Sequence, residues 1–199
     1  MTPEPSRIGI FGGTFDPIHV GHLVAAVNVR YALRLDRLLL VVANQPWQKE
    51  GQRSISAADD RFAMVAAAVG ESPGLEASRI EIDRGGPSFT SETVEEIAGL
   101  FPGAALFCVV GADVADVLHT WERSDVIARL ATLVVVNRPG SVRTAPLVGW
   151  RVEEVEVPAL EVSSTDVRAR AVDGRPLDYL VPEGAVRFIR SRNLYAGGG

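Results

Sequence analysis

The sequence predicts an α/β fold, a Rossmann-like, doubly wound parallel sheet with helices on both faces, formed as a single domain by residues 1–199. Three observations lead to this prediction. Short apolar runs alternate with helical patterns along the whole chain, as they do in parallel sheets. The run at 38–42 is apolar throughout, as a strand buried on both faces should be. The composition, 47% hydrophobic and 23% charged among 199 residues, suits one domain with a sizeable core.

The first half of the chain begins with a strand at 7–11 that breaks at a glycine pair. A helix is predicted over 23–33, where Leu23, Val27 and Tyr31 follow one another at a spacing of four and form an apolar stripe. The elements that come next are a strand over 38–42, a helix over 57–69, a short strand over 79–82, and a helix that Thr90 or Ser91 caps and that ends at Leu100.

The second half continues the alternation of strands and helices. The predicted elements are a strand over 106–110, a helix from about residue 125, strands over 133–136 and 152–157, a helix opened by Ser163, and a last helix over 182–192. We expect residues 7–195 to be ordered and the glycines at 197–199 to fray.

Charge and cysteine usage limit the function. The net charge of −5, from 20 basic and 25 acidic residues, argues against nucleic acid as a partner. The single cysteine excludes an intramolecular disulfide, and the apolar run around Cys108 predicts a buried thiol. With neither a signal peptide nor an apolar segment of about 20 residues, we expect a cytoplasmic protein without a membrane partner. The oligomeric state stays open, a homo-oligomer being one alternative.

The segment 8–22 contains the strongest functional signal. Gly12 and Gly13 allow backbone N–H groups to approach a ligand, and the helix N-terminus beyond them favours an anion. A glycine pair by itself is as often a plain tight turn, and a single histidine is more often structural. Two of the three histidines of the chain, His19 and His22, lie in this one turn, and their spacing of three predicts one helical face. Together these features favour phosphate binding.

Polar side chains also follow the later strands. Because ligands lie beyond the carboxyl ends of the strands in open α/β sheets, the loop residues Trp47 and Lys49 are placed to meet one. Asp113 and Arg138 each come directly after a strand and are expected at the same edge. A surface lysine and a tryptophan that packs on its own loop are the alternative interpretation of 43–49.

A second phosphate-binding group is predicted near the C-terminus. Ser164 and Thr165 stand at the start of a helix, and Arg168 follows one turn later on the same side. Free N–H groups, hydroxyls and a guanidinium suit a phosphate. By itself this stretch would be a plain N-cap with a solvent-facing arginine, but beside the histidine turn we favour phosphate binding.

The string Gly-Gly-Thr-Phe-Asp-Pro-x-His-x-Gly-His at 12–22, together with Ser-Ser-Thr-x-x-Arg at 163–168, resembles the paired signature of the nucleotidyltransferases related to class I aminoacyl-tRNA synthetases. Among these, the chain resembles the bacterial nicotinate-nucleotide adenylyltransferases. Four further features carry this resemblance: Lys49, the string Pro-Ser-Phe-Thr at 87–90, Gly-Ala-Asp at 111–113 with Trp121 after it, and Arg-Pro-Gly at 138–140. The loop at 45–49 departs from the usual Pro-Pro-His-Lys, since it reads Gln-Pro-Trp-Gln-Lys.

The resemblance implies transfer of AMP from ATP to nicotinate mononucleotide, which gives deamido-NAD and pyrophosphate. The catalytic residues it implies are His19, His22, Lys49 and Arg168. Those implied for ATP are Gly12, Gly13, Thr14, Phe15, His19, His22, Ser164, Thr165 and Arg168. Those implied for nicotinate mononucleotide are Lys49, Thr90, Asp113, Trp121 and Arg138. Mg²⁺ is expected as the counter-ion of ATP, bound through phosphates and water and not by a protein cage.

Two alternatives remain at this point. Pantetheine-phosphate adenylyltransferase and the cytidylyltransferases share the first motif, although Trp121 and Arg138 argue against them. A nucleotide-binding sensor that has lost catalysis is the other alternative. Loss of catalysis should first remove the two histidines or Arg168, and all three are present.

Overall fold

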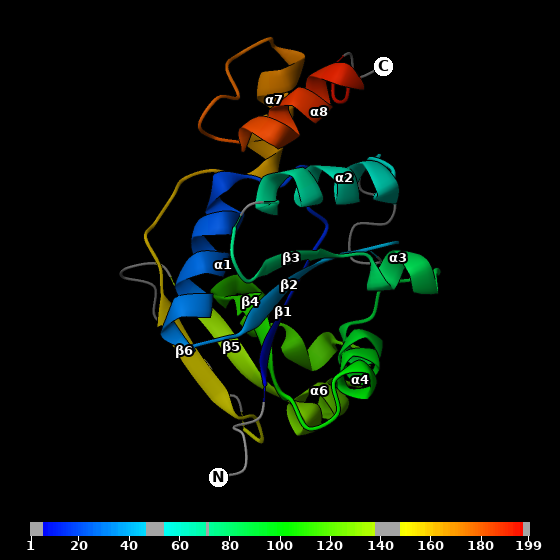
Figure 1. Ribbon diagram of the computed structural model, residues 1–199, viewed down its shortest axis with the longest axis vertical. Helices are drawn as coiled ribbons and strands as arrows, with labels where there is room; N and C mark the ends of the chain where they lie inside the picture. The colour runs from blue at the N-terminus through cyan, green and yellow to red at the C-terminus, as the bar shows by residue number, and fades with distance from the viewer. Residues whose placement is uncertain (1–5, 47–53, 71, 138–147, 197–199) are drawn as a thin grey trace.

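Parallel strands form the sheet at the centre of the structure (Figure 1). The computed structural model describes residues 6–46, 54–70, 72–137 and 148–196. Within these residues the sheet has six strands in the order β3-β2-β1-β4-β5-β6, and every neighbouring pair is parallel. The strands are β1 (Arg7–Gly13), β2 (Arg37–Val42), β3 (Leu75–Ser78), β4 (Ala105–Gly111), β5 (Ala131–Asn137) and β6 (Val152–Glu156). The predicted fold class is confirmed.

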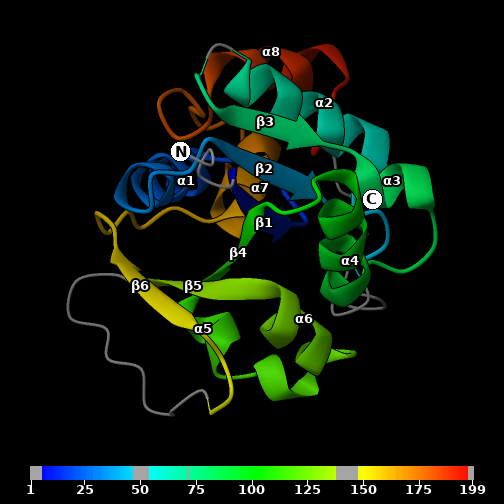
Figure 2. The same cartoon turned by 60° about the horizontal axis from the view of Figure 1, so that its bottom comes forward.

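Helices cover both faces of the sheet, with α1, α2 and α8 on one side and α4 and α6 on the other (Figure 2). The helices of the described residues are α1 (Val20–Ala32), α2 (Ala58–Val69), α3 (Ile80–Arg84), α4 (Thr90–Leu100), α5 (Ala112–Ala115), the 3-10 helix η2 (Leu118–Thr120), α6 (Ser124–Leu130), α7 (Ser164–Val172) and α8 (Glu183–Ser191). Among these helices, none has both the length and the apolar character needed to cross a bilayer.

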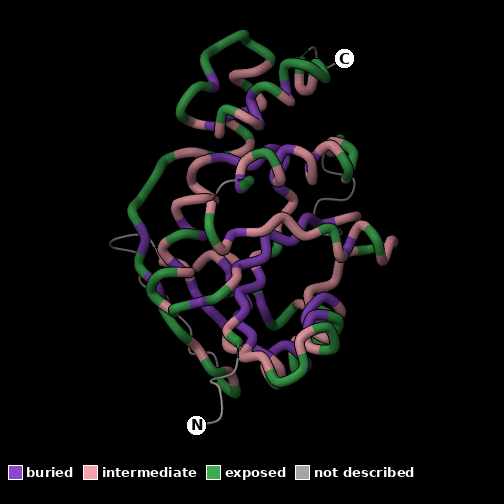
Figure 3. The backbone as a smooth tube through the Cα atoms, in the orientation of Figure 1, coloured by how far each residue is buried: buried purple, intermediate pink, exposed green. Residues whose placement is uncertain are grey.

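Strand β2 shows why its sequence is apolar without alternation. Leu38 and Leu40 belong to the core on the side of α1, α2 and α8, whereas Leu39 and Val41 belong to the core on the side of α4 and α6. Successive side chains of a strand point to opposite faces, and here both faces are buried. The central strands are accordingly buried along most of their length (Figure 3).

The order of the strands creates a crevice at one end of the sheet. The chain runs outward from β1 to β2 and β3, then returns to place β4 on the other side of β1. The connections that leave β1 and β4 therefore run in opposite directions, and the place where they separate is a topological switch point. In open α/β sheets, ligands bind at such a point, beyond the carboxyl ends of the strands. Gly12 and Gly13 lie at that end of β1, paired in register with Val41 and Val42.

The predicted strand over 79–82 is wrong. The strand lies earlier, at β3, where Leu75 pairs with Leu38, and residues 80–84 form the short helix α3. Strand β3 stands at the sheet edge and only Leu75 is buried in it, so its apolar signal is weak. Ile80 and Ile82 alternate with polar residues as in a strand, but in α3 they pack against the two different cores. Between them Glu81 is buried, and its carboxylate accepts a hydrogen bond from the Thr93 hydroxyl at 2.6 Å.

The predicted apolar stripe of α1 is also wrong. Val27 is 46% exposed and Tyr31 is 86% exposed. Ala25, Ala26 and Val29 are the buried residues of α1. Their small side chains let the helix lie close to the sheet. Of the three predicted positions, Leu23 packs against the core and is partly buried. The other predicted helices and strands are confirmed, with ends that differ by at most 3 residues.

Cys108 lies in the middle of β4 and is 2% exposed, so the predicted buried thiol is confirmed. Burial raises the pKa of Cys108 from its ordinary value of 9.0 to about 12. The thiolate is the reactive form, and at neutral pH the native protein contains very little of it.

We predict that the folding of the chain protects Cys108 from thiol reagents. At pH 8 the native protein should react with 5,5′-dithiobis(2-nitrobenzoate) at least ~100-fold more slowly than the urea-unfolded protein, because reaction requires both opening of the core and ionisation. The absorbance of the released thionitrobenzoate measures both rates. Similar rates in the two states would contradict the burial of this thiol.

Candidate active site

Two cavities adjoin each other at the carboxyl end of the sheet. The larger has a volume of about 1040 Å³ and lies between the start of α1 and the start of α7. The smaller has a volume of about 470 Å³ and lies between the ends of β1 and β4 and the start of α4. Phe11, Gly111 and Asp113 line both cavities. Two ligands bound in them would therefore meet at the switch point of the sheet.

The histidine turn borders the larger cavity. His19 is the N-cap residue of α1 and His22 stands three residues later, and the backbone N–H of His19 donates to Nδ1 of His22 at 3.2 Å. The two rings are stacked, with centroids 3.7 Å apart and planes 26° from parallel. Because Nδ1 of His22 accepts this hydrogen bond, the neutral ring carries its proton on Nε2 and can donate from there. The turn therefore presents two adjacent imidazoles to the cavity.

Aromatic rings pack behind His22. The Phe15 ring lies edge-on to the His22 ring, with centroids 5.0 Å apart, and Phe11 meets Phe15 in the same manner at 5.9 Å. Phe15 is 2% exposed and lines neither cavity. The predicted ATP-binding residue Phe15 therefore has its side chain in the core, where it holds the orientation of His22.

The start of α7 is bound to the turn between β1 and α1. The Ser164 hydroxyl donates to the carbonyl oxygen of Pro17 at 2.8 Å, and Nη1 of Arg168 donates to the carbonyl oxygen of Asp16 at 2.7 Å. Nη2 of Arg168 also contacts the Thr165 hydroxyl at 3.2 Å. Ser164, Thr165 and Arg168 thus lie beside the histidines and line the same cavity. Arg168 in addition supports the backbone of the turn.

Arg61 of α2 was not predicted as a functional residue. It is 1% exposed, and its guanidinium donates to the carbonyl oxygens of Ser56, Thr14 and Asn44 at 2.9, 2.9 and 3.0 Å. It thereby joins the loops that follow β1 and β2. Sequence periodicity offered a signal, because Arg61 stands at an apolar position of α2, on one face with Met64, Val65 and Val69. An arginine at such a position needs several partners, here backbone carbonyls.

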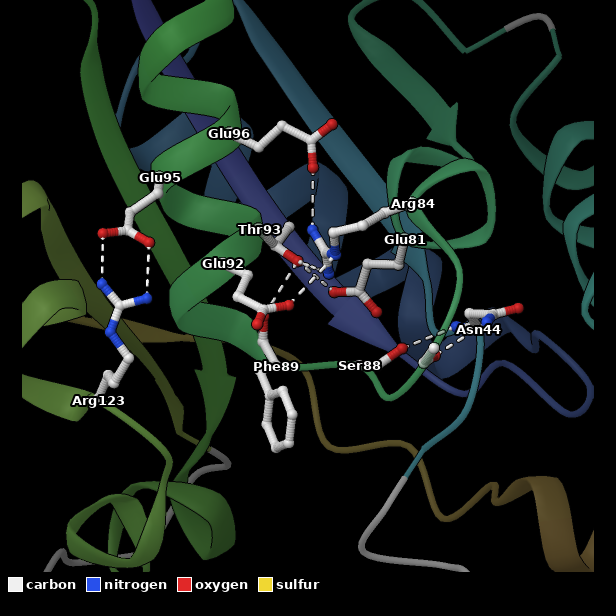
Figure 4. Close-up of polar contacts among 11 residues, drawn as sticks. Asn44, Glu81, Arg84, Ser88, Phe89, Glu92, Thr93, Glu95, Glu96 and Arg123 are labelled. Atoms are coloured by element: carbon white, nitrogen blue, oxygen red, sulfur yellow. Dashed lines mark hydrogen bonds and ion pairs between the residues drawn. The ribbon is translucent and has the colours of Figure 1, made fainter.

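The start of α4 borders the smaller cavity. The segment before it is attached to the loop after β2, since Ser88 N–H donates to the carbonyl oxygen of Gln45 at 3.0 Å and the Asn44 N–H donates to the Ser88 hydroxyl at 2.8 Å (Figure 4). The predicted cap by Thr90 or Ser91 is wrong: Phe89 is the N-cap residue, and no side chain in the described part of the chain caps the helix. Thr90 itself lines the cavity. The first backbone N–H groups of α4, which no side chain of the described residues caps, therefore lie beside the smaller cavity.

Ion pairs hold α4 to its neighbours, as Figure 4 shows. Arg84 lies between Glu96 at 2.9 Å and Glu92 at 3.4 Å. Arg123 forms two hydrogen bonds to the carboxylate of Glu95, at 2.6 and 2.9 Å, and these bonds raise the pKa of Arg123. Arg123 follows the segment that carries Trp121, which lines the smaller cavity. The pair with Glu95 thus holds the Trp121 segment against α4.

The structure brings most of the predicted site residues to one of the two cavities. His19, His22, Ser164, Thr165 and Arg168 line the larger cavity. Gly12, Gly13, Thr14, Thr90 and Trp121 line the smaller one, and Asp113 lines both. Lys49 and Arg138 lie outside the described residues, as does Trp47.

Comparison with known proteins gives consistent matches. The sequence pattern of the cytidylyltransferase-like family matches residues 10–170. A probable nicotinate-nucleotide adenylyltransferase of Streptomyces coelicolor is 49% identical over 187 residues, which cover 94% of this chain and 99% of that protein. A protein of the same description from Mycobacterium tuberculosis is 41% identical over 198 residues, which cover 96% and 92%.

A solved structure shares the fold. The nicotinic acid mononucleotide adenylyltransferase of Plasmodium falciparum, complexed with NaAD, aligns with a TM-score of 0.77 and covers 96% of this chain and 97% of that one. The two sequences are 16% identical, so the similarity concerns the fold.

We predict that Arg61 stabilises the loops around the cavities. Arg61→Lys keeps the charge but replaces a planar fork of donors by one ammonium group, so we expect at least two of the three carbonyls to lose their donor. The free energy of unfolding, measured by urea denaturation, should fall by about 2–4 kcal/mol.

The matched control for this substitution is Arg187→Lys on α8. That side chain is 71% exposed and pairs with Glu183. Its replacement should change the free energy of unfolding by no more than about 0.5 kcal/mol. Equally small changes in the two variants would contradict the role of Arg61.

Proposed function

The chain belongs to the cytidylyltransferase-like family and, within it, to the nicotinate-nucleotide adenylyltransferases; on that premise we propose that it transfers AMP from ATP to nicotinate mononucleotide. The products are deamido-NAD and pyrophosphate. The observation that carries the proposal is the pair of cavities that meet at Phe11, Gly111 and Asp113, since the reaction joins two nucleotides end to end.

ATP is assigned to the larger cavity. His19, His22 and Arg168 line it and can donate to phosphate oxygens, and Ser164 and Thr165 add hydroxyls at the start of α7. The helix N-termini of α1 and α7 both begin at this cavity, which favours negative charge there. Lys49 is proposed as a further phosphate contact, as the resemblance implies.

Nicotinate mononucleotide is assigned to the smaller cavity. Trp121 offers an aromatic face for the pyridine ring, and the N–H groups at the start of α4 suit the carboxylate of the nicotinate. Gly12, Gly13 and Thr14 bring the backbone close to both substrates. We assign Asp113, which lines both cavities, to a ribose hydroxyl. Arg138 is proposed for the phosphate of this substrate.

The proposed reaction requires the two substrates to be aligned, and it needs no reactive side chain of the enzyme. The 5′-phosphate oxygen of nicotinate mononucleotide forms a bond to the α-phosphorus of ATP while the bond from that phosphorus to the bridging oxygen of pyrophosphate breaks. No covalent intermediate with the enzyme is needed. Preorganised donors that meet the charge on the α-phosphate and on the departing pyrophosphate lower the barrier. His19 and His22 have this role in the proposal, and the ring of Phe15 behind His22 supports it.

A divalent cation is expected with the triphosphate, and we propose Mg²⁺. Magnesium prefers oxygen ligands and keeps several waters, so phosphate oxygens of ATP and water would hold it. When bound, the cation neutralises part of the charge on the triphosphate.

The proposal predicts pyrophosphate release with ATP and nicotinate mononucleotide, and a preference for this acid over nicotinamide mononucleotide. The amide turns its NH₂ group toward at least one N–H of α4, which leaves a buried donor without a partner at a cost of ~1–3 kcal/mol. We therefore expect kcat/KM to favour the acid by roughly tenfold to a few hundredfold. A coupled pyrophosphate assay at saturating ATP measures both values.

The same assay tests the alternatives. 4′-Phosphopantetheine with ATP, and CTP in place of ATP, should release pyrophosphate no faster than the background. Turnover of either, without turnover of nicotinate mononucleotide, would overturn the proposed function, whereas a preference for the amide would overturn only the assignment of α4 to the carboxylate.

A second prediction concerns His22. Its replacement by alanine should leave the fold intact and lower kcat by roughly 10²–10³, the loss usual for one transition-state donor. The matched control is His119→Ala, because His119 is exposed on η2 and lines neither cavity. Steady-state kinetics on both variants decide the point: a His22→Ala enzyme within a few-fold of the wild type speaks against the role of the histidine.

A further inference from the structure

The turn at Asp16 and Pro17 receives hydrogen bonds from three side chains of the last third of the chain. Ser164 donates to the carbonyl oxygen of Pro17, and Arg168 donates to that of Asp16. The third donor is the hydroxyl of Tyr195, which lies 2.8 Å from Oδ1 of Asp16. Asp16 and Tyr195 are 179 positions apart in the sequence. The first two donors line the larger cavity, whereas Tyr195 does not.

The carboxylate of Asp16 requires such a partner. Asp16 is 1% exposed, and a buried carboxylate is costly unless it accepts hydrogen bonds. Tyr195 is suited to supply one, because burial, together with the nearby Asp16 carboxylate, raises the pKa of the phenol above its ordinary value of 10.0. The hydroxyl therefore keeps its proton and acts as a donor throughout the physiological pH range.

Tyr195 is itself held in place by the last helix. Leu194 N–H donates to the carbonyl oxygen of Ile189 at 3.0 Å, which turns the chain back after α8, and Tyr195 follows with φ at +65°. Helix α8 packs against α2 through a face on which Ala185, Val186 and Ile189 are buried. Figure 1 shows α8 beside α2 at the end of the molecule where the C-terminus lies. Tyr195 lies beyond the end of α8, and its partly buried ring packs against the same core as α2 and α8.

We propose that Tyr195 is a positioning residue for the proposed ATP site, which holds Asp16 and so fixes the turn that carries His19 and His22. The inference rests on the proposed function, because it assigns these histidines to the triphosphate. Asp16 stands three positions before His19, the N-cap residue of α1, so the orientation of this turn sets where both rings lie. A second contact acts on the same helix end, since Val20 N–H donates to the carbonyl oxygen of Leu180 at 2.9 Å.

The test is Tyr195→Phe, which removes one hydroxyl and keeps the partly buried ring. ATP affinity is measured by calorimetry without the second substrate, and kinetics are measured with nicotinate mononucleotide. We expect roughly tenfold weaker ATP binding and a similar fall in kcat/KM for ATP, because a hydrogen bond to a charged group is lost. The KM for nicotinate mononucleotide should stay within about twofold, since neither Asp16 nor Pro17 lines its cavity.

Two controls separate positioning from general stability. Tyr179→Phe removes the same hydroxyl from a side chain that is 93% exposed, and its ATP affinity should equal that of the wild type. In a double-mutant cycle, Tyr195→Phe should have little further effect on kcat/KM for ATP in an Asp16→Ala background, because the hydroxyl acts through that carboxylate. All measurements are made well below the Tm of each variant.

The outcomes are distinct. Unchanged ATP affinity in Tyr195→Phe would overturn the inference, and so would equal losses for both substrates or additive effects in the cycle. If the wild type binds ATP but does not use nicotinate mononucleotide, the proposed function fails, while weaker ATP binding by Tyr195→Phe would still support the positioning role.

Discussion

The turn at Asp16 and Pro17 is the constraint on which the rest of the site depends. Its two carbonyl oxygens accept hydrogen bonds from Arg168 and Ser164, which stand 152 and 147 positions away in the sequence. These bonds satisfy backbone groups that would otherwise be costly to bury, and they bring the start of α7 beside the start of α1. The two segments to which we assign the phosphates of ATP lie far apart in the sequence, and they thereby face one cavity.

Much of the fold follows from local signals, and the exceptions have physical causes. Strand β2 is recognisable because it is apolar along its length, as its burial on both faces requires. Strand β3 is at the sheet edge and has little to bury, so its four residues resemble a loop. The following helix resembles a strand because Ile80 and Ile82, which pack against different cores, alternate with polar residues. The order of the strands depends on long-range pairing, which no local pattern encodes.

Some residues of the candidate site could be predicted from the sequence and others could not. His19, His22 and Arg168 belong to the first group, because they follow glycines or hydroxyl residues at the start of a helix, a pattern that favours anion binding. The position of Arg61 on the apolar face of α2 indicates burial, but its three carbonyl partners come together only in the folded chain. Tyr195 carries no sequence signal, since its partner Asp16 lies 179 positions away. Phe15 belongs to the same motif as His22, yet its ring packs against His22 and the core and does not line a cavity. Which motif side chains face a cavity depends on the conformation of the turn, and residue type alone does not predict it.

The contact between Tyr195 and Asp16 has a consequence for biosynthesis. The ribosome makes the histidine turn among the first residues of the chain, but the hydroxyl that completes its support comes 179 positions later. A nascent chain can therefore pair its early strands before the proposed ATP site is complete. Premature termination of translation and proteolysis near the C-terminus would have the same effect. Loss of Tyr195 and the residues after it would leave all six described strands in place, whereas the first motif would lack one of its supports.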